Sequence, residues 1–460
     1  MPAAVISRNP ATGATVFRCA GTSPAGVSAA VDAASRAGGP WAAVPISERA
    51  GVLRRFADLV DSSAGELAEL VTAEVGKRRV EADGEVEWTA LSARWYADHP
   101  PQAERVAGAV VHRRPLGVIA VVTPWNVPLV TPAWKWLPAL VAGNTVVWKP
   151  SELATGVAAR GVELLRAAGL PDEVLQLVPG DAEVATGLCR DERVAGVHFT
   201  GSTRAGRSLA ALVAPRFARC ALEMGGVNAA LVFADADLPA AADAIVAAAT
   251  SINGQKCTAV RTVLVAAAAA EVLLTEIAQR VAALTPGDPA EPRTTLGPLI
   301  SEAACARAGE AVAAAVARGG RVVARSPAPA GAFAARGTFF PATVLTDLPA
   351  DDALGTEEVF APVLTVQRFG NAEEAWQLAA RSGYGLGAAV YTADQGVVAE
   401  ATRRLAVGVL TVNRRADAVD LEAPFGGRGL SGNGFPEGGS YVYSAVTDRQ
   451  AVYGDAGGPG

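Results

Sequence analysis

The chain has 460 residues, of which 50% are hydrophobic and 19% charged, a composition typical of a globular protein with two or three packed domains. Its 40 basic and 46 acidic residues give a net charge of −6 without any basic tract, so we expect no nucleic-acid partner. The N-terminal sequence does not have the pattern of a signal peptide. The apolar stretch 263–274 is too short for a bilayer and is interrupted by Glu271, so no membrane partner is expected.

The cysteines are odd in number and show no paired spacing. A disulfide framework or a metal site is therefore not expected, and a reducing cytoplasm is the predicted location. The five residues are Cys19, Cys189, Cys220, Cys257 and Cys305.

Residues 1–100 are predicted to be mostly helical, because apolar residues recur every three or four positions in 25–44 and 46–76. From residue 116 onward, short apolar runs alternate with helical patterns. This alternation predicts βαβ units and mostly parallel sheets in two α/β domains, the second beginning near residue 226. Strands are expected at 116–122, 145–148, 174–178, 194–199, 230–233 and 262–265, and helices at 153–169, 181–191, 204–214 and 238–250.

Polar residues follow three of the predicted strands, at the ends where open α/β sheets bind ligands. Asn126 follows the first strand, Lys149 and Glu152 follow the second, and a Gly-Ser-Thr turn follows the strand 194–199. A glycine turn that opens a helix offers free N–H groups to a phosphate. The alternative for Asn126, for Glu152 and for the turn is that each caps a helix.

Two reactive side chains lie in unusual surroundings. Glu223 lies between two apolar runs, where a carboxylate must be paired or catalytic, and a structural ion pair is the alternative. Cys257 lies among small and polar residues in the stretch SINGQKCTAVRT, which is not typical of a core. The Lys256 charge and a predicted helix start are expected to favour the reactive thiolate, and a small buried hydrophobe is the alternative.

Seven motifs together resemble the NAD(P)-dependent aldehyde dehydrogenase superfamily, over nearly the whole chain from 9–13 to 441–453. The motifs are, in order, PWN, AGNTVVWKPSE, FTGS, LEMGG, GQKCTA, EEVFAPV and PFGGRGLSG. The resemblance implies an α/β fold with a Rossmann-like cofactor domain, a second α/β catalytic domain and a small β oligomerisation flap. The implied ranges are 1–96 and 116–225 for the NAD-binding domain with 426–440 returning to it, 226–425 for the catalytic domain, and 97–115 with 441–455 for the flap.

The resemblance also implies the site residues. Cys257 matches the nucleophile, Asn126 matches the side chain that forms the oxyanion hole with the Cys257 N–H, and Glu223 matches the general base. NAD is the expected cofactor and NADP the second choice, because the Glu152 carboxylate would repel the additional phosphate of NADP. The implied cofactor contacts are Thr123, Pro124, Trp125, Lys149, Ser151, Glu152, Gly201, Ser202, Leu222, Gly225, Glu358 and Phe360.

The substrate is an aldehyde, and the residues near its expected access route include two arginines. Arginines there can hold a substrate carboxylate, which favours a semialdehyde. The alternative is that they pair with Asp417, Asp420 or Glu422. The expected pocket residues are Thr131, Trp134, Lys256, Thr258, Arg414 and Arg415.

Three other functions remain open. In a coenzyme A-acylating dehydrogenase a thiol resolves the thioester, but the presence of Glu223 favours water. A cysteine hydrolase would need His99, His112 or His198 as a partner, and His198 is expected in the core. A non-catalytic binding protein is the third alternative. By resemblance, the flap implies a homodimer or homotetramer.

Overall fold

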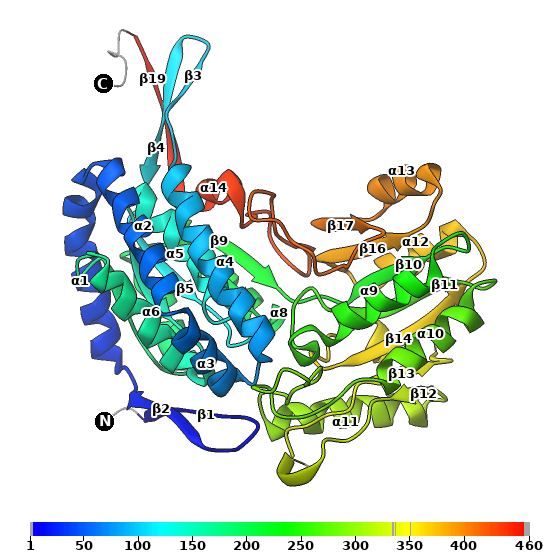
Figure 1. The fold of residues 1–460 in the computed structure, drawn as a ribbon. Coiled ribbons are helices and arrows are strands. Elements are labelled where there is room, and N and C mark those ends of the chain that lie inside the picture. Colours follow the sequence, from blue (N-terminus) through cyan, green and yellow to red (C-terminus); the bar gives the residue numbers. More distant parts are fainter. Residues whose placement is uncertain (1–2, 334, 336, 350, 455–460) are drawn as a thin grey trace.

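The computed structural model describes residues 3–333, 335, 337–349 and 351–454. Figure 1 shows two α/β lobes side by side, with a narrow β flap projecting from the first lobe. The chain builds the first lobe, then the second, and finally returns to the first, where its last strand joins the flap.

The first lobe is built on a sheet of five parallel strands. Successive side chains of each strand point to opposite faces, and both faces are buried. Ile119 and Val121 thus face one helical layer, while Ala120 and Val122 face the other. In spatial order the strands are β7 (Leu175–Leu177), β6 (Thr145–Lys149), β5 (Val118–Val122), β8 (Val194–Gly201) and β9 (Arg219–Met224).

Helices cover both faces of this sheet (Figure 1). One layer contains α1 (Pro24–Ala43), α7 (Ala182–Arg190) and α8 (Thr203–Val213). The other contains α2 (Ile46–Ser62), α3 (Ala64–Val75), α4 (Arg79–Asp98), α5 (Val130–Ala142) and α6 (Thr155–Ala167).

The second lobe has a seven-stranded sheet that is parallel except at one edge, where β12 pairs antiparallel with β13. Its order is β12 (Arg321–Arg325), β13 (Thr343–Thr346), β14 (Val363–Phe369), β11 (Val260–Ala266), β10 (Asn228–Val232), β16 (Gly387–Tyr391) and β17 (Val409–Val412). One face packs on α9 (Leu238–Thr250) and α10 (Ala270–Ala282), and the other on α12 (Ala372–Ala380) and α13 (Gln395–Arg404). The helix α11 (Glu302–Ala317) belongs to a buried cluster that also includes Leu345 of β13 and Val363 of β14.

The flap is a three-stranded antiparallel sheet that combines residues from distant parts of the chain. Its strands are β3 (Glu104–Val106), β4 (Ala109–Pro115) and β19 (Thr447–Tyr453), with β4 in the middle. Arg114 Nε donates to Gln450 Oε1 at 2.9 Å across the pair formed by β4 and β19. The short helix α14 (Tyr443–Val446) precedes β19, and a small pair joins β15 (Tyr384–Gly385) to β18 (Arg428–Gly429).

The predicted α/β fold with mostly parallel sheets is confirmed. The prediction of mostly helices for residues 1–100 missed a hairpin, which β1 (Ala4–Arg8) and β2 (Thr15–Ala20) form ahead of the helices. Its turn is fixed by Asn9, whose Oδ1 accepts from the N–H groups of Ala11 and Thr12. The domain ranges stay predictions, and residue 455 of the flap range lies outside the described residues. Every described helix is too short or too polar to span a bilayer.

Candidate active site

The ends of the parallel strands bring the expected site residues together between the lobes. Asn126 follows β5, Lys149 ends β6, and Gly201 ends β8, all in the first sheet. Glu223 lies near the end of β9, and Cys257 lies in the turn that leads into β11 of the second sheet. Ligand sites of open α/β sheets lie at such carboxyl ends.

The chain reaches Cys257 through a strained segment. A 3₁₀ turn, η3 (Ser251–Gly254), follows α9, and Ile252 and Asn253 have φ values of 49° and 57°, in the left-handed region. Such a conformation costs on the order of 1–3 kcal/mol per residue, and a β-branched side chain rarely adopts it. Gly254 is also left-handed, and a Cβ there would lie 2.3 Å from the Pro362 nitrogen, so only glycine fits.

Asn228 fixes the backbone on the other side of the cysteine. Its Nδ2 donates to the carbonyl of Cys257 at 2.7 Å and to that of Ala259 at 2.9 Å. Its Oδ1 accepts from the Gly387 N–H at 3.0 Å, which ties the turn to β16. The cysteine backbone is therefore held by the second lobe's own sheet.

The Asn126 side chain is linked directly to the cysteine segment. Its Nδ2 donates to the carbonyl of Gln255, two residues before Cys257, at 2.9 Å, and the residue is buried. A carboxamide has two N–H groups, so one remains for a ligand oxygen. The recorded contact goes to another segment and not to the start of α5, so it is not a helix cap.

The prediction that the surroundings of Cys257 favour the thiolate is wrong for the protein without ligands. Burial raises the pKa of the Cys257 thiol to about 12; Lys256 lowers it, and Glu358 and Glu223 raise it further. Cys257 lies in a turn between η3 and β11, so the predicted helix start is also wrong. Burial thus favours the neutral thiol at Cys257, although the residue keeps partial solvent exposure.

Glu223 is buried and forms no ion pair within the described part of the chain. Its Oε2 accepts from the Gly427 N–H at 2.9 Å. Burial, and after it the charge of Glu437, raises the pKa of Glu223 well above its ordinary value. The Gly427 contact and Lys135 act in the opposite direction. A carboxyl with a raised pKa is suited to accept a proton near neutral pH.

Sequence reasoning missed the buried ion pair of Lys135 and Glu437. The charges of both residues act on the pKa of Glu223. Lys135 lies in α5 and is fully buried, and its partner is 302 residues away. The only local signal was a lysine within the otherwise apolar run VTPAWKWLPALVA. A buried lysine requires a partner, but the sequence could not indicate which carboxylate supplies it.

The first half of the expected cofactor site has groups that fit a dinucleotide. Lys149 Nζ lies 3.3 Å from Glu152 Oε2, and half of the Glu152 side chain is exposed and available to ribose hydroxyls. Ser151 caps η1 (Glu152–Ala154), and Ser202 caps α8 by accepting from the Ala205 N–H at 3.3 Å. The Gly-Ser-Thr turn therefore is a helix cap, and it leaves other N–H groups of α8 for a phosphate.

The second half contains a buried carboxylate, Glu358, with one oxygen that has no hydrogen-bond partner within the described chain. Oε1 of Glu358 is buried without a hydrogen-bond partner among the described residues and lies 4.0 Å from Arg261. Burial raises the pKa of Glu358 to about 7, although Arg261 and a hydrogen bond from the Gly226 N–H both act to lower it. A Cβ on Gly225 would overlap Glu358 Oε2 at 1.8 Å, so glycine leaves room for that carboxylate. An oriented acceptor without a partner fits a ribose hydroxyl, so the residues present fit NAD(P).

The remaining predicted cofactor residues surround these two groups. The Trp125 ring meets the Phe360 ring edge-on at 5.9 Å, and Trp148 Nε1 donates to Thr123 Oγ1 at 2.9 Å. Pro124 lies between Thr123 and Trp125, and Leu222 is buried in β9. These contacts join protein residues to one another, so the roles of these residues toward a cofactor stay predictions.

The expected substrate residues divide into an apolar and a charged group. Trp134 is buried, donates from Nε1 to Ser92 Oγ at 2.8 Å, and meets the Phe425 ring edge-on at 5.8 Å. Thr131 lies one turn earlier on α5 and is half-buried. Thr258 is buried, and its Oγ1 has no hydrogen-bond partner within the described chain.

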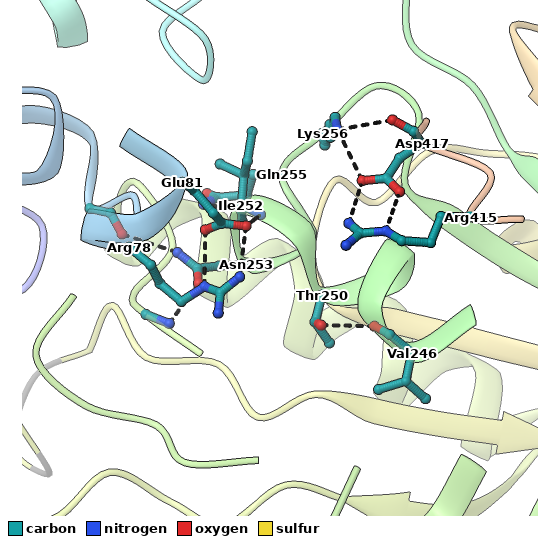
Figure 2. A network of polar contacts seen from close by, with 12 residues as sticks. Arg78, Glu81, Val246, Thr250, Ile252, Asn253, Gln255, Lys256, Arg415 and Asp417 are labelled. Carbon is teal, nitrogen blue, oxygen red and sulfur yellow. Dashed lines mark hydrogen bonds and ion pairs between the residues drawn. The ribbon is translucent and has the colours of Figure 1, made fainter. Parts of the chain in front are cut away.

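The charged group centres on Asp417, which is 2% exposed in its side chain (Figure 2). Lys256 donates to its Oδ2 at 2.9 Å, and Arg415 binds both carboxylate oxygens at 2.9 and 2.8 Å. The alternative reading, pairing with an acidic residue, therefore holds for Arg415. Arg414 is exposed and lines a cavity of about 390 Å³ that also includes Asp420.

The histidines do not provide the partner that a cysteine hydrolase needs. His198 is buried in β8, its Nε2 lies 3.2 Å from the Ala445 carbonyl oxygen, and burial lowers its pKa to about 4. His99 stacks on Trp95, and His112 lies in the flap strand β4.

Comparison with known proteins agrees with this arrangement. The model of the aldehyde dehydrogenase family matches residues 3–452. The chain is 37% identical to the NADP/NAD-dependent aldehyde dehydrogenase PuuC of Escherichia coli strain K12, over 86% of this chain and 81% of PuuC. It is 31% identical to the α-ketoglutaric semialdehyde dehydrogenase of Bacillus subtilis strain 168, over 93% of this chain and 89% of that protein.

A solved structure of PnpE in complex with nicotinamide adenine dinucleotide is similar to the whole chain. The TM-score is 0.94 with 32% sequence identity, over 99% of this chain and 95% of PnpE. The chain therefore belongs to the aldehyde dehydrogenase family and is an NAD(P)-dependent aldehyde dehydrogenase.

Proposed function

We propose that the enzyme oxidises a semialdehyde that carries a distal carboxylate, with Cys257 as nucleophile, Asn126 as oxyanion donor and Glu223 as general base. The observation that carries the proposal is the 2.9 Å hydrogen bond from Asn126 Nδ2 to the Gln255 carbonyl. This bond orients a neutral donor beside the segment that carries Cys257.

The first step is the addition of the Cys257 sulfur to the aldehyde carbon. Because the resting thiol is neutral, its proton must leave to solvent as the bond forms, so that Glu223 stays ionised for the later hydrolysis. Negative charge then develops on the aldehyde oxygen. The free N–H of Asn126 and the Cys257 backbone N–H stabilise it, each by roughly 3–4 kcal/mol.

The second step converts the adduct to a thioester on Cys257. The chemistry supplied by bound NAD(P) is acceptance of a hydride. Lys149, Glu152 and Glu358 are the proposed residues that hold it, and NAD is the proposed preference. Glu223 then takes a proton from the water that hydrolyses the thioester, which yields a carboxylic acid and the free thiol.

The substrate class follows from the charges near Cys257. Lys256 and Arg415 share the single carboxylate of Asp417, so this cluster has a net charge of one positive unit. Such a cluster attracts an anionic group on the substrate. The Bacillus subtilis relative, an α-ketoglutaric semialdehyde dehydrogenase, supports the same class.

We also propose that the enzyme is a cytoplasmic homodimer or homotetramer that assembles through the flap. Val106 and Tyr453 of the flap are 54% and 78% exposed, although both side chains are large and apolar. Light scattering during size-exclusion chromatography measures the assembly, and a monomer would refute this part of the proposal.

The test compares aldehydes with and without a distal carboxylate, read as NADH absorbance, for the wild type and Cys257→Ala. We expect turnover of semialdehydes with acid as the product, and loss of at least 99% of kcat in Cys257→Ala. Cys305→Ala is the matched control, because it removes another partly buried free thiol and is expected to keep full activity. Acyl-coenzyme A as the main product when coenzyme A is added would instead support the acylating alternative.

A further inference from the structure

The helix α4 presents two carboxylates one turn apart, and each holds a different loop of the proposed active site. Glu81 lies in the first turn of α4, and Glu85 follows four residues later. Side chains at this spacing lie on the same face of a helix. Neither residue belongs to the catalytic or cofactor set described above.

Glu81 contacts the segment that carries the nucleophile. Its Oε1 accepts from the Ile252 N–H at 2.8 Å, although the two residues are 171 positions apart (Figure 2). Arg78 pairs with the same carboxylate at 2.9 Å, and the Glu81 side chain is 16% exposed. The carboxylate is thus fixed at both ends, and the contact crosses from the first lobe to the second.

The segment that Glu81 holds is the strained one. Ile252 and Asn253 both have positive φ values, and Ile252 is β-branched. Asn253 is held separately, since its Nδ2 donates to the Gly76 and Pro298 carbonyls at 3.1 and 3.0 Å. Glu81 supplies the acceptor for the other strained residue, because its carboxylate receives the Ile252 N–H.

Glu85 contacts the loop that carries the oxyanion donor. Its Oε1 accepts from the N–H groups of Leu129 and Val130 at 2.8 and 3.2 Å, and its Oε2 pairs with Lys77. Leu129 is the N-cap of α5 and lies three residues after Asn126. The buried ion pair fixes this carboxylate, so the start of α5 is tied rigidly to α4.

A continuous set of hydrogen bonds joins these two contacts. The Ile252 carbonyl accepts from the Gln255 N–H at 2.9 Å, and the Gln255 carbonyl accepts from Asn126 Nδ2 at 2.9 Å. We infer that Glu81 is a positioning residue. Glu85 holds the start of α5, and the contact of Glu81 with Ile252 then sets the distance between Asn126 Nδ2 and the Cys257 N–H. This inference rests on the proposed function, in which those two groups are the oxyanion donors.

The test uses three variants of Glu81. Glu81→Leu removes the acceptor, and Glu81→Asp shortens the side chain that carries it. Glu81→Gln keeps an acceptor oxygen on a side chain of the same length. Two rates are measured on each folded variant: the single-turnover burst of NADH, and alkylation of Cys257 by iodoacetamide without cofactor. Only the burst forms an oxyanion, so the ratio of the two rates reports donor placement separately from thiol reactivity.

We expect Glu81→Leu and Glu81→Asp to slow the burst by about 10- to 100-fold and to change alkylation by less than about threefold. Glu81→Gln is expected to stay within about threefold of the wild type in both rates, because it still accepts the Ile252 N–H. Should Glu81→Leu fail to fold, Glu81→Asp provides the test.

Glu74→Leu is the matched control for general destabilisation. Glu74 in α3 is also a buried carboxylate that accepts backbone N–H groups, but those N–H groups, of Gly156 and Val157, lie at the start of α6. The inference is overturned if Glu74→Leu slows the burst as much as Glu81→Leu, if alkylation falls together with the burst, or if Glu81→Leu bursts normally. A wild type without any NADH burst would refute the proposed function itself, so the two failures are distinguishable.

Discussion

The pKa of about 12 at Cys257 predicts how the protein without cofactor reacts with a thiol reagent as the pH is raised. Iodoacetamide alkylates only the thiolate, so the rate rises tenfold per pH unit below the pKa. At pH 8, a thiol with the ordinary value of 9.0 is about one-tenth thiolate, whereas a pKa of about 12 leaves about one part in ten thousand. The structure therefore predicts a slow, pH-limited nucleophile.

The assay alkylates the protein at pH 7, 8, 9 and 10 and quantifies the peptide that contains Cys257 by mass spectrometry. We expect a straight line of slope one in log rate against pH, a rise of about 1000-fold over the range. Cys305, with a pKa raised to about 11 mainly by burial, is the internal reference and should reach the same thiolate fraction about one pH unit earlier. A plateau for Cys257 between pH 7 and 9 would refute the reasoning, because it would show that the Lys256 charge outweighs burial.

Three further predictions test other parts of the site. Glu223→Gln should keep the NADH burst within about threefold but slow the steady state at least 100-fold, because glutamine cannot take the proton of water; equal losses in both phases would remove Glu223 as the deacylation base. The wild type should show a higher kcat/KM with NAD than with NADP, and Glu152→Ala should lower that ratio about tenfold or more; an unchanged ratio would contradict the stated cause. Although burial acts to raise it, Lys256 and Arg415 lower the pKa of Asp417 from 3.8 to about 2, so the ionised form stabilises the fold by about 2 kcal/mol above pH 4. Urea unfolding should show that loss for Asp417→Asn at pH 7 and a smaller one at pH 3, since the contribution disappears as the pH falls through 2; an equal loss at both would contradict the ion-pair origin.

Local patterns were sufficient to predict β5 to β8 of the first sheet and β10 and β11 of the second, whereas β9, β13, β14, β16 and β17 were not predicted. The run 116–122 contains β5, and the run 262–265 lies within β11, because strands buried on both faces read as continuous apolar segments. The N-terminal hairpin was harder, since β1 and β2 are short and partly exposed. The alternation of apolar and polar residues in these two strands is weaker than the helical periodicity of the residues that follow.

Long-range electrostatics could not be predicted from the sequence. The expected thiolate at Cys257 considered its neighbour Lys256, but the pKa is set mainly by burial between the two lobes. Likewise, Glu437 gives no local sign that it adjoins Glu223, because the two are brought together by the returning C-terminal segment. Motif order predicted which residues gather at the site, and packing determines their protonation.

The pairing of β4 with β19 has a consequence for how the protein is made on the ribosome. Arg114 and its partner Gln450 are separated by 336 residues, which take on the order of 20–70 s to synthesise at roughly 5–20 residues per second. During that interval β4 has only the short strand β3 beside it, and one of its edges is open. Gly427, whose N–H donates to Glu223, is also synthesised late. A nascent chain is therefore expected to need chaperone protection of β4 until Thr447 and the residues after it have left the exit tunnel.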